Sequence, residues 1–287
     1  MRWLAGGINN IFLEHLRKAG QADEAGGRQP QGRKGKQMLN KFGTGRWKTP
    51  SAEFSEVSNR ALTAEHTLIA GATGCGKSTF IHSIMFAALA QYTPEQAKFV
   101  LIDPKSVELM RYRKLPHTIQ YTDTEAGAVD ALEYVQGLMV ARYQIMKRAD
   151  RELWTEADGA QIFVVIEELS DLMVCPVAKQ IKLAIQRLTQ KGRAAGIHII
   201  AATQAPSRKI IPAEITLNFT ARFALACEST IESKQVIGQG GAENLPDHGE
   251  AIYKYRRRIE KVALPFVQKQ EVMELVNYWT RAAFIAA

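Results

Sequence analysis

Cysteines and long apolar segments are scarce in this sequence of 287 residues. Its three cysteines, Cys75, Cys175 and Cys227, are odd in number and far apart, which argues against a disulfide framework and for reduced thiols in the cytoplasm. No uninterrupted apolar run approaches the roughly 20 residues that cross a bilayer. Charged residues also break up the apolar part of the first 18 positions, which is not the pattern of a secretory signal.

Acidic residues are scarce in the first fifty positions, and this sets the net charge of the chain. Residues 1–50 contain ten Lys or Arg against three acidic residues, so they supply seven of the eight net positive charges. The rest of the chain is close to neutral. The overall charge of +8 is therefore weaker evidence for nucleic-acid binding than it first looks.

Residues 1–50 form a predicted N-terminal region that differs from the rest in composition. Residues 3–16 place apolar side chains at roughly helical spacing, which predicts a short amphipathic segment. This segment can pack on the rest of the chain, on another copy, or on a membrane surface or membrane-associated partner. Residues 20–50 are rich in Gly, Gln, Lys and Arg and predict a flexible basic linker, which either solubilises the chain or holds DNA non-specifically.

Residues 51–287 alternate short apolar runs with longer segments of helical periodicity. The runs are apolar throughout, which is typical of strands in a parallel sheet that is covered on both faces. We therefore expect an α/β fold with a mostly parallel sheet and helices on both faces. The expected strands are 66–71, 98–103, 162–167, 197–203, 221–227 and 250–254, and the expected helices are 77–91, 125–147, 178–194 and 269–283.

A phosphate-binding loop follows the first expected strand. The sequence GATGCGKS, residues 71–78, fits G-x-x-x-x-G-K-[ST] and precedes a segment of helical periodicity, as this motif requires. Its glycines let backbone amides point at phosphate oxygens, Lys77 neutralises the terminal phosphates, and the Ser78 hydroxyl is placed to bind Mg²⁺. ATP and Mg²⁺ are the expected cofactors. The expected nucleotide-binding residues are Gly71, Ala72, Thr73, Gly74, Cys75, Gly76, Lys77, Ser78 and Thr79.

Cys75 lies inside this loop and has two interpretations. It is either a small packing residue or a thiol whose oxidation blocks nucleotide binding.

Two adjacent carboxylates follow the apolar run 162–166. A phosphate-binding loop needs an acid from a neighbouring strand to hold the metal. We assign Glu167 to the metal side, through water, and Glu168 to the orientation and activation of the attacking water. The metal and Lys77 offset the repulsion between the two acids. Without a phosphate-binding loop, the same pair would simply begin a capped helix.

Five stretches together carry a resemblance that covers most of residues 65–283. They are AGATGCGKST, FVLIDPKSVEL, VVIEELSDLM, LTQKGRAAGIHIIAATQAPS and ESTIESKQVIGQGGAENLPDHGEAIY. In these motifs the chain resembles the motor domain of FtsK/SpoIIIE-type DNA translocases, and the combination is far more specific than a phosphate-binding loop alone. The resemblance implies a RecA-like P-loop NTPase that assembles as a ring, usually a hexamer, around double-stranded DNA. It also implies that ATP binds between subunits and that hydrolysis drives the duplex through the pore.

The resemblance assigns roles to single residues. Gln204 corresponds to the γ-phosphate sensor of the family. Arg193 aligns with the arginine finger that one subunit offers to its neighbour's ATP, where a guanidinium stabilises charge on the transferring phosphoryl group. Arg222 is the second choice for the finger, with a structural or phosphate-relay role favoured. Asp103 and Lys105 match a family signature at the nucleotide edge of the sheet; otherwise they form a local ion pair that orders their loop.

The metal-side acid departs from the family pattern. It is usually Asp in the family, whereas Glu167 is longer by one methylene, about 1.5 Å, so slower turnover or a contact through water is expected.

The DNA-contacting loops also depart from the family pattern. Three positions that are basic in the family are uncharged here, namely Ala205, Thr216 and Thr230. The expected DNA-binding residues are Lys234, which keeps its charge, and Arg208 and Lys209, which lie nearby. Fewer phosphate contacts predict weaker binding with a smaller salt dependence. A further basic cluster, residues 256–258, is expected at an exposed strand end or hairpin.

The leading functional prediction is an ATP-driven translocase of double-stranded DNA. The chain shows neither the membrane anchor nor the winged-helix sequence reader of full-length chromosome translocases. This shortness favours a plasmid, phage or integrative element, for example in conjugation or partition, although a fragment looks the same. One alternative is the motor of a type VII protein-secretion machine. The smaller number of basic residues in the DNA-contacting loops favours this alternative, and the lack of tandem motor domains disfavours it. The other is a non-hydrolysing coupling subunit, which the intact Lys77, Ser78, Glu168 and Arg193 disfavour.

Overall fold

The computed structural model describes residues 52–286, which fall within one compact unit of the chain. The predicted amphipathic segment and basic linker, residues 1–50, lie outside the described residues. Within the part that is described, no helix is both long and apolar enough to span a membrane.

An eight-stranded sheet forms the centre of this unit, with the strand order β3-β2-β4-β5-β1-β6-β7-β8. Every neighbouring pair from β3 to β6 is parallel, and β7 and β8 add an antiparallel hairpin at the edge next to β6. The strands are β1 (His66–Ala70), β2 (Ala97–Ile102), β3 (Thr118–Thr122), β4 (Gln161–Ile166), β5 (Ile197–Thr203), β6 (Ala221–Ala224), β7 (Glu250–Tyr255) and β8 (Arg258–Ala263).

The central strands are buried on both faces, which explains their uninterrupted apolar sequences. Every residue of β1 is buried, and β4 and β5 each have a single partly exposed position. Alternate residues point to opposite faces of a strand. In β6, Phe223 packs into the core beneath α4 (Lys77–Gln91), whereas Ala224 joins a smaller cluster with residues of α9 (Thr230–Ile237).

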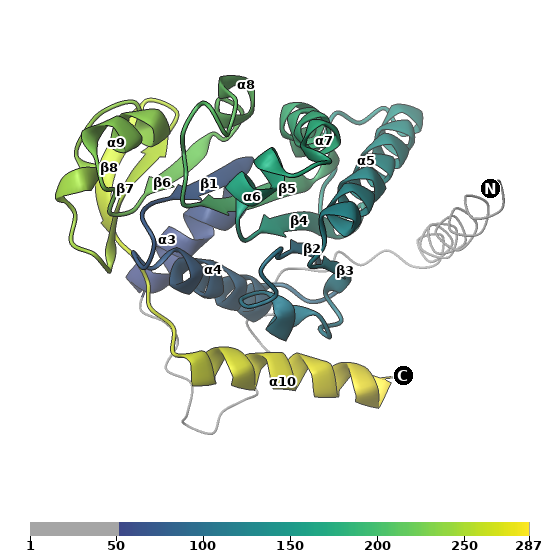
Figure 1. Cartoon of the computed structure of the whole chain (residues 1–287). Helices are drawn as coiled ribbons and strands as arrows, with labels where there is room; N and C mark the ends of the chain where they lie inside the picture. Colours follow the sequence, from purple (N-terminus) through teal and green to yellow (C-terminus); the bar gives the residue numbers. More distant parts are fainter. Residues whose placement is uncertain (1–51, 287) are drawn as a thin grey trace. The chain divides into compact units, whose positions relative to one another are not determined.

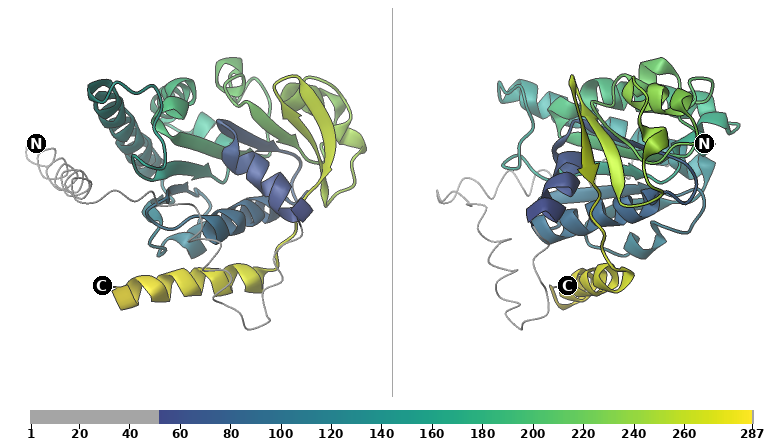
Figure 2. Two further views of the ribbon diagram at one scale, coloured as in Figure 1. Left: turned by 180° about the vertical axis from the view of Figure 1, so that it is seen from behind. Right: turned by 90° about the vertical axis from the view of Figure 1, so that its left-hand side faces the viewer.

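Helices cover both faces of the sheet (Figure 1). The helix α3 (Ala52–Thr63) packs against α4 on one face, and α10 (Lys269–Ala286) lies outside α4, where the Trp279 indole donates to the Leu89 carbonyl at 3.0 Å. The opposite face carries α5 (Glu125–Arg148), α6 (Leu169–Val174) and α7 (Ala178–Lys191), with the short α8 (Ala213–Thr216) against α7. Figure 2 shows the same layers from behind and from the side.

The expected fold class is confirmed, and the differences lie in the more polar elements. The predicted helices 77–91, 125–147 and 269–283 are observed, while the predicted helix 178–194 ends its α-helical part at Lys191 and continues as a 3₁₀ turn, Gly192–Ala195. The expectation omitted β3 and β8, because an edge strand exposes one side and its sequence is not an apolar run. It also omitted the helices α3, α6, α8 and α9, and its strand 221–227 ends at Ala224 in the structure.

Candidate active site

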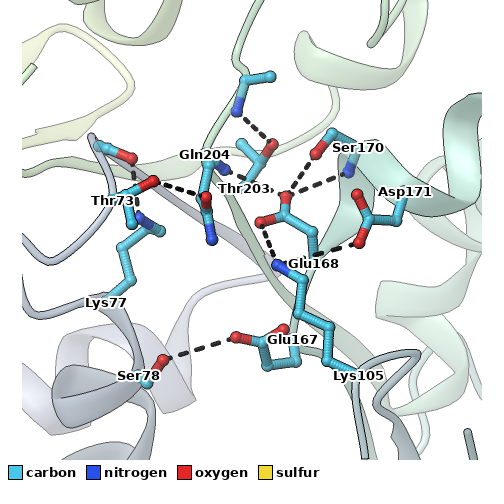
Figure 3. A network of polar contacts seen from close by, with 12 residues as sticks. Thr73, Lys77, Ser78, Lys105, Glu167, Glu168, Ser170, Asp171, Thr203 and Gln204 are labelled. Carbon is cyan, nitrogen blue, oxygen red and sulfur yellow. Dashed lines mark hydrogen bonds and ion pairs between the residues drawn. The ribbon is translucent and has the colours of Figure 1, made fainter. Parts of the chain in front are cut away.

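The expected site residues meet at one edge of the sheet. Adjacent parallel strands end on the same side, so the segments after β1, β5, β4 and β2 lie next to one another there. We call this side the carboxyl edge and the opposite side the amino edge. Figure 3 shows the carboxyl edge, where the loop after β1 faces the acids after β4 and the polar residue after β5.

The loop between β1 and α4 has the backbone that a phosphate-binding loop needs. Gly74 and Gly76 have φ values of 79° and 96°, a left-handed region that favours glycine. Gly71 has no room for a side chain, because a Cβ there would lie 2.7 Å from the Cys75 sulfur and 2.9 Å from the Leu225 Cβ. The helix α4 begins directly after this loop at Lys77, so its free amides and positive dipole end face the loop.

Lys77 curls back over its own loop. Its ammonium donates to the carbonyl oxygens of Gly71 at 2.8 Å and of Ala72 at 2.6 Å. Burial lowers its pKa, and the nearby charges of Glu168 and Glu167 oppose that shift. These carbonyls hold the cation at the start of α4, where it can also meet a phosphate oxygen.

Cys75 packs beneath this loop. It is buried, and burial raises the pKa of its thiol while the charge of Lys77 opposes the rise. A buried thiol with a raised pKa forms little reactive thiolate, so these features favour the packing role over the redox role.

Glu167 and Ser78 face each other across the carboxyl edge. The Ser78 hydroxyl donates to one oxygen of Glu167 over a long 3.5 Å, and the other oxygen, Oε2, is buried without a hydrogen-bond partner among the described residues. Burial raises the pKa of Glu167; Lys105 lowers it, and the charge of Asp103 raises it further. A buried carboxylate oxygen without a donor is suited to a cation.

These residues fit Mg²⁺ that arrives with a nucleotide. No group of three or more His, Cys, Asp or Glu able to hold a metal occurs in the described part of the chain. Mg²⁺ in such sites is bound through one or two protein oxygens together with phosphate oxygens and water. Ser78 and Glu167 would provide that protein contribution, so the donor set suits a metal carried by a triphosphate rather than a resident metal.

Glu168 is buried, with 1% of its surface exposed, and its two oxygens have different partners. Oε1 accepts from the Ser170 hydroxyl at 2.5 Å, from the Ser170 amide at 3.4 Å and from the Gln204 amide at 3.1 Å. Oε2 lies 3.5 Å from the Lys105 ammonium. Glu168 is thus the N-cap of α6 and also part of the carboxyl-edge site, which combines the two interpretations of the acid pair.

Gln204 connects Glu168 to the phosphate-binding loop. Its side-chain oxygen accepts from the Thr73 hydroxyl at 2.8 Å, while its backbone amide donates to Glu168. A short chain of hydrogen bonds therefore joins the loop to the acid.

The alternative of a local ion pair between Asp103 and Lys105 is wrong. Asp103 instead accepts from the backbone amides of Glu108 at 2.9 Å and Leu109 at 2.8 Å, and so orders the loop by itself. Lys105 reaches across to Glu168 and, at 3.9 Å, to Asp171. Sequence reasoning missed this contact, although the end of β2 beside β4 was a usable signal.

Arg193 lies at the amino edge, away from the carboxyl-edge site of its own chain. It belongs to the 3₁₀ turn before β5, whereas the phosphate-binding loop follows the far end of β1. Its side chain is 63% exposed and pairs with Glu65 at 3.0 Å. Its role as an arginine finger toward a neighbouring copy stays a prediction. Arg222 donates to the carbonyls of Phe219 and Val236 at 2.9 and 3.0 Å, which favours a structural role.

The side chain of Arg142 supports the turn that carries Arg193. The Arg142 guanidinium is buried and donates to the carbonyls of Ala195 and Ala160, each at 2.6 Å. It also lies 4.4 Å from the ring centre of Trp154. Burial lowers the pKa of Arg142 to about 10. Sequence reasoning missed this support, because its partners are backbone carbonyls that no motif marks.

Glu65 collects four donors at the amino edge. Besides Arg193, it accepts from Thr220 at 2.6 Å, Tyr255 at 3.3 Å and Arg256 at 3.2 Å. Burial alone would raise the pKa of Glu65, but the hydrogen bonds from Thr220 and Arg256 and the charge of Arg193 lower it to about 2.

This lowered pKa predicts how stability depends on pH. The ordinary pKa is 4.5, so the ionised Glu65 stabilises the fold fully above pH 4.5, and that contribution is lost as pH falls from 4.5 towards 2. Glu65→Gln should therefore melt below the wild type at neutral pH, and the gap should narrow over this window in thermal unfolding followed by circular dichroism. The exposed Glu152, changed to Gln, serves as the control. A gap that stays constant from pH 6 to 2 would contradict the assignment.

The expected DNA-binding residues are exposed. Arg208 and Lys209 lie in the turn after β5, and Lys234 lies on α9, which follows β6. Because β5 and β6 flank β1, these segments flank the phosphate-binding loop at the carboxyl edge.

The length of Glu167 gives a test of the metal-side assignment. Glu167→Asp should keep ATP hydrolysis within about tenfold of the wild type, because water can bridge the lost methylene. Glu167→Ala should lose most Mg²⁺-dependent nucleotide binding. Hydrolysis rates at a series of Mg²⁺ concentrations would show both effects. An alanine variant with the wild-type Mg²⁺ dependence would exclude this role.

Comparison with known proteins places these features in context. The sequence profile of the FtsK/SpoIIIE family matches residues 47–159 and 149–208. DNA translocase FtsK of Staphylococcus aureus is 38% identical over 235 residues, covering 74% of this chain and 29% of the relative. DNA translocase FtsK of Rickettsia bellii is 34% identical over 254 residues, covering 74% of this chain and 34% of the relative. The chain thus spans about a third of the length of these relatives.

Two solved structures share the fold. A monomer of the pCW3 conjugation coupling protein TcpA with ATPγS has a TM-score of 0.67 at 21% identity, covering 76% of this chain and 66% of that one. The cytoplasmic domain of the Thermomonospora curvata type VII secretion ATPase EccC has a TM-score of 0.64 at 21% identity, covering 76% and 28%.

Proposed function

The chain belongs to the FtsK/SpoIIIE family, and from this premise we propose that it hydrolyses ATP to move double-stranded DNA in the cytoplasm. The observation that carries the proposal is the carboxyl edge, where Lys77, Ser78, Glu167, Glu168 and Gln204 from three adjacent strands come together. Each has the residue type that phosphoryl transfer to water requires.

The residues divide the chemistry among themselves. Mg²⁺, bound with ATP by Ser78 and Glu167, supplies charge neutralisation of the triphosphate. Lys77 holds the terminal phosphates. Glu168 orients the attacking water and accepts its proton, and its hydrogen bond from the Gln204 amide fixes the carboxylate. The Thr73 contact couples Gln204 to the loop, so the sensor can report whether the terminal phosphate is present.

Assembly completes the proposed site. Arg193 lies at the amino edge, opposite the nucleotide site of its own chain, so we propose that it stabilises a transition state on a neighbouring copy. We infer a ring, a hexamer by resemblance to the family, in which hydrolysis depends on contact between copies.

The proposed substrate is duplex DNA held through phosphates. The exposed Arg208, Lys209 and Lys234 flank the site on the carboxyl edge, where motion coupled to hydrolysis can reach them. The relatives called DNA translocases support this substrate. TcpA, which shares the fold, is a conjugation coupling protein, and DNA transfer of a mobile element, or partition, is the context we propose.

A second candidate is the motor of a protein-secretion machine. The uncharged Ala205, Thr216 and Thr230 favour it, because a protein substrate needs no row of phosphate-binding cations. The likeness to EccC supports it only at the level of fold.

ATP hydrolysis with and without duplex DNA separates these candidates. We expect linear duplex DNA to stimulate hydrolysis severalfold, and the triple change Arg208→Ala, Lys209→Ala and Lys234→Ala to reduce that stimulation. The matched control replaces three exposed lysines elsewhere, Lys114, Lys147 and Lys179. A hydrolysis rate that DNA does not change would favour the secretion motor. The absence of hydrolysis would favour a non-hydrolysing coupling subunit.

A further inference from the structure

The amino edge carries a second exposed guanidinium beside Arg193. Arg256 occupies the turn between β7 and β8, and its Nη2 binds the same Glu65 oxygen, Oε1, that binds Arg193. Arg193 and Arg256 therefore lie side by side, although 63 residues separate them in sequence. Both side chains are mostly exposed, at 63% and 61%.

The arrangement differs from an ordinary surface ion pair. Glu65 is only 7% exposed and accepts from three separate parts of the chain, including Thr220 and Tyr255. One buried negative charge holds two positive charges, so the cluster presents net positive charge to its surroundings. Glu65 offsets only one of the two positive charges, so a further anion that contacts the pair would lower its electrostatic free energy.

Arg256 has an uncommon backbone conformation that is tied to the strand beside it. Its φ is 56°, an uncommon region for a residue other than glycine, and its amide donates to the Thr220 carbonyl at 3.4 Å. The guanidinium lies over the Tyr255 ring, 5.3 Å from its centre. With one nitrogen on Glu65, most of its donors are free to meet an anion.

The anion cannot be the nucleotide of the same chain. The five residues of β1 separate Glu65 from the phosphate-binding loop, a distance of about 20 Å along the strand. A triphosphate on another copy is an anion whose oxygens match the planar fork of a guanidinium.

Building on the proposed function, we propose that Arg256 is a second catalytic residue acting in trans. Together with Arg193 it contacts the triphosphate bound by a neighbouring copy, and Glu65 is the positioning residue that holds the two guanidinium groups side by side.

Trans-complementation tests this role. Arg256→Asn removes the guanidinium, and asparagine tolerates the left-handed backbone. We expect its kcat for ATP hydrolysis to fall about tenfold or more, with an unfolding temperature close to the wild type. Mixing it with Lys77→Ala, whose Arg256 is intact, should restore part of the activity that neither variant shows alone. Arg257→Asn, in the same hairpin and exposed, is the matched control and should keep the wild-type kcat.

Glu65 gives a second readout. Glu65→Gln should lower kcat while the KM for ATP changes less than about twofold, and it should also recover on mixing with Lys77→Ala. Should Arg256→Asn not fold, Arg256→Lys replaces it, with the same comparison and a smaller expected loss.

The outcomes separate this proposal from the proposed function. If the wild type hydrolyses ATP but Arg256→Asn keeps its kcat, or loses it without recovery on mixing, the proposal is overturned and the proposed function stands. A wild-type chain that hydrolyses no ATP overturns both.

Discussion

Glu168→Gln is expected to retain ATP but to hydrolyse it about 100-fold more slowly or worse, since a positioned general base contributes on that order. The amide oxygen can still accept from Ser170 and Gln204, so the cap of α6 and the link to the sensor are preserved. The amide cannot take the proton of the attacking water. Single-turnover hydrolysis, with bound nucleotide measured in parallel, would show ATP trapped in the site.

Asp171→Asn is the matched control for this variant. Asp171 also lies near Lys105, at 3.9 Å, but it is partly exposed and outside the hydrogen-bond network of Gln204. It should hydrolyse ATP at nearly the wild-type rate. Unimpaired hydrolysis in Glu168→Gln would remove the assignment of Glu168 as the base.

Arg193→Ala is expected to lower kcat by about 1,000-fold or more, the range found for arginine fingers. The nucleotide site of the variant chain stays intact, because Arg193 lies at the other edge of the sheet, so its affinity for ATP should be nearly unchanged. Steady-state hydrolysis and nucleotide binding measured on the same preparation would show this split.

Mixing two inactive variants shows whether Arg193 acts on its own chain or on a neighbouring copy. Arg193→Ala and Lys77→Ala are each inactive alone, and their mixture should regain activity where an intact Arg193 meets an intact loop. Lys191→Ala, two residues away and exposed, is the control, because the change keeps the backbone carbonyl that accepts from the Tyr143 hydroxyl at 2.8 Å. An Arg193→Ala chain with near wild-type hydrolysis would contradict the role in trans.

The elements that have a distinctive local sequence pattern were predicted from the sequence. The strands β1, β4 and β5 are buried at all but one position in each of β4 and β5, and they are therefore mostly apolar. The phosphate-binding loop follows from its glycines and from the helix after it. The residues at the carboxyl edge were predicted together, because parallel neighbouring strands bring their ends to one place.

The amino-edge cluster could not be predicted in the same way. Glu65, Arg193 and Arg256 come from three distant parts of the chain, and only the pairing of β5, β1, β6 and β7 brings them together. The basic cluster 256–258 was correctly expected at a strand end or hairpin. Its acidic partner, Glu65, was not predicted, because no local sequence pattern distinguishes an acid that precedes β1. The reach of Lys105 to Glu168 was missed for the same reason.

Equilibrium binding of a slowly hydrolysed fluorescent ATP analogue, to the wild type and to Lys77→Ala, tests the nucleotide site most directly. The wild type should bind the analogue more tightly with Mg²⁺ than in excess chelator. Lys77→Ala should weaken the Mg²⁺-dependent binding by about tenfold or more, which corresponds to a loss of about 1.4 kcal/mol of binding free energy. Equal affinity of the two chains, or no binding by either, would contradict a nucleotide site at the carboxyl edge.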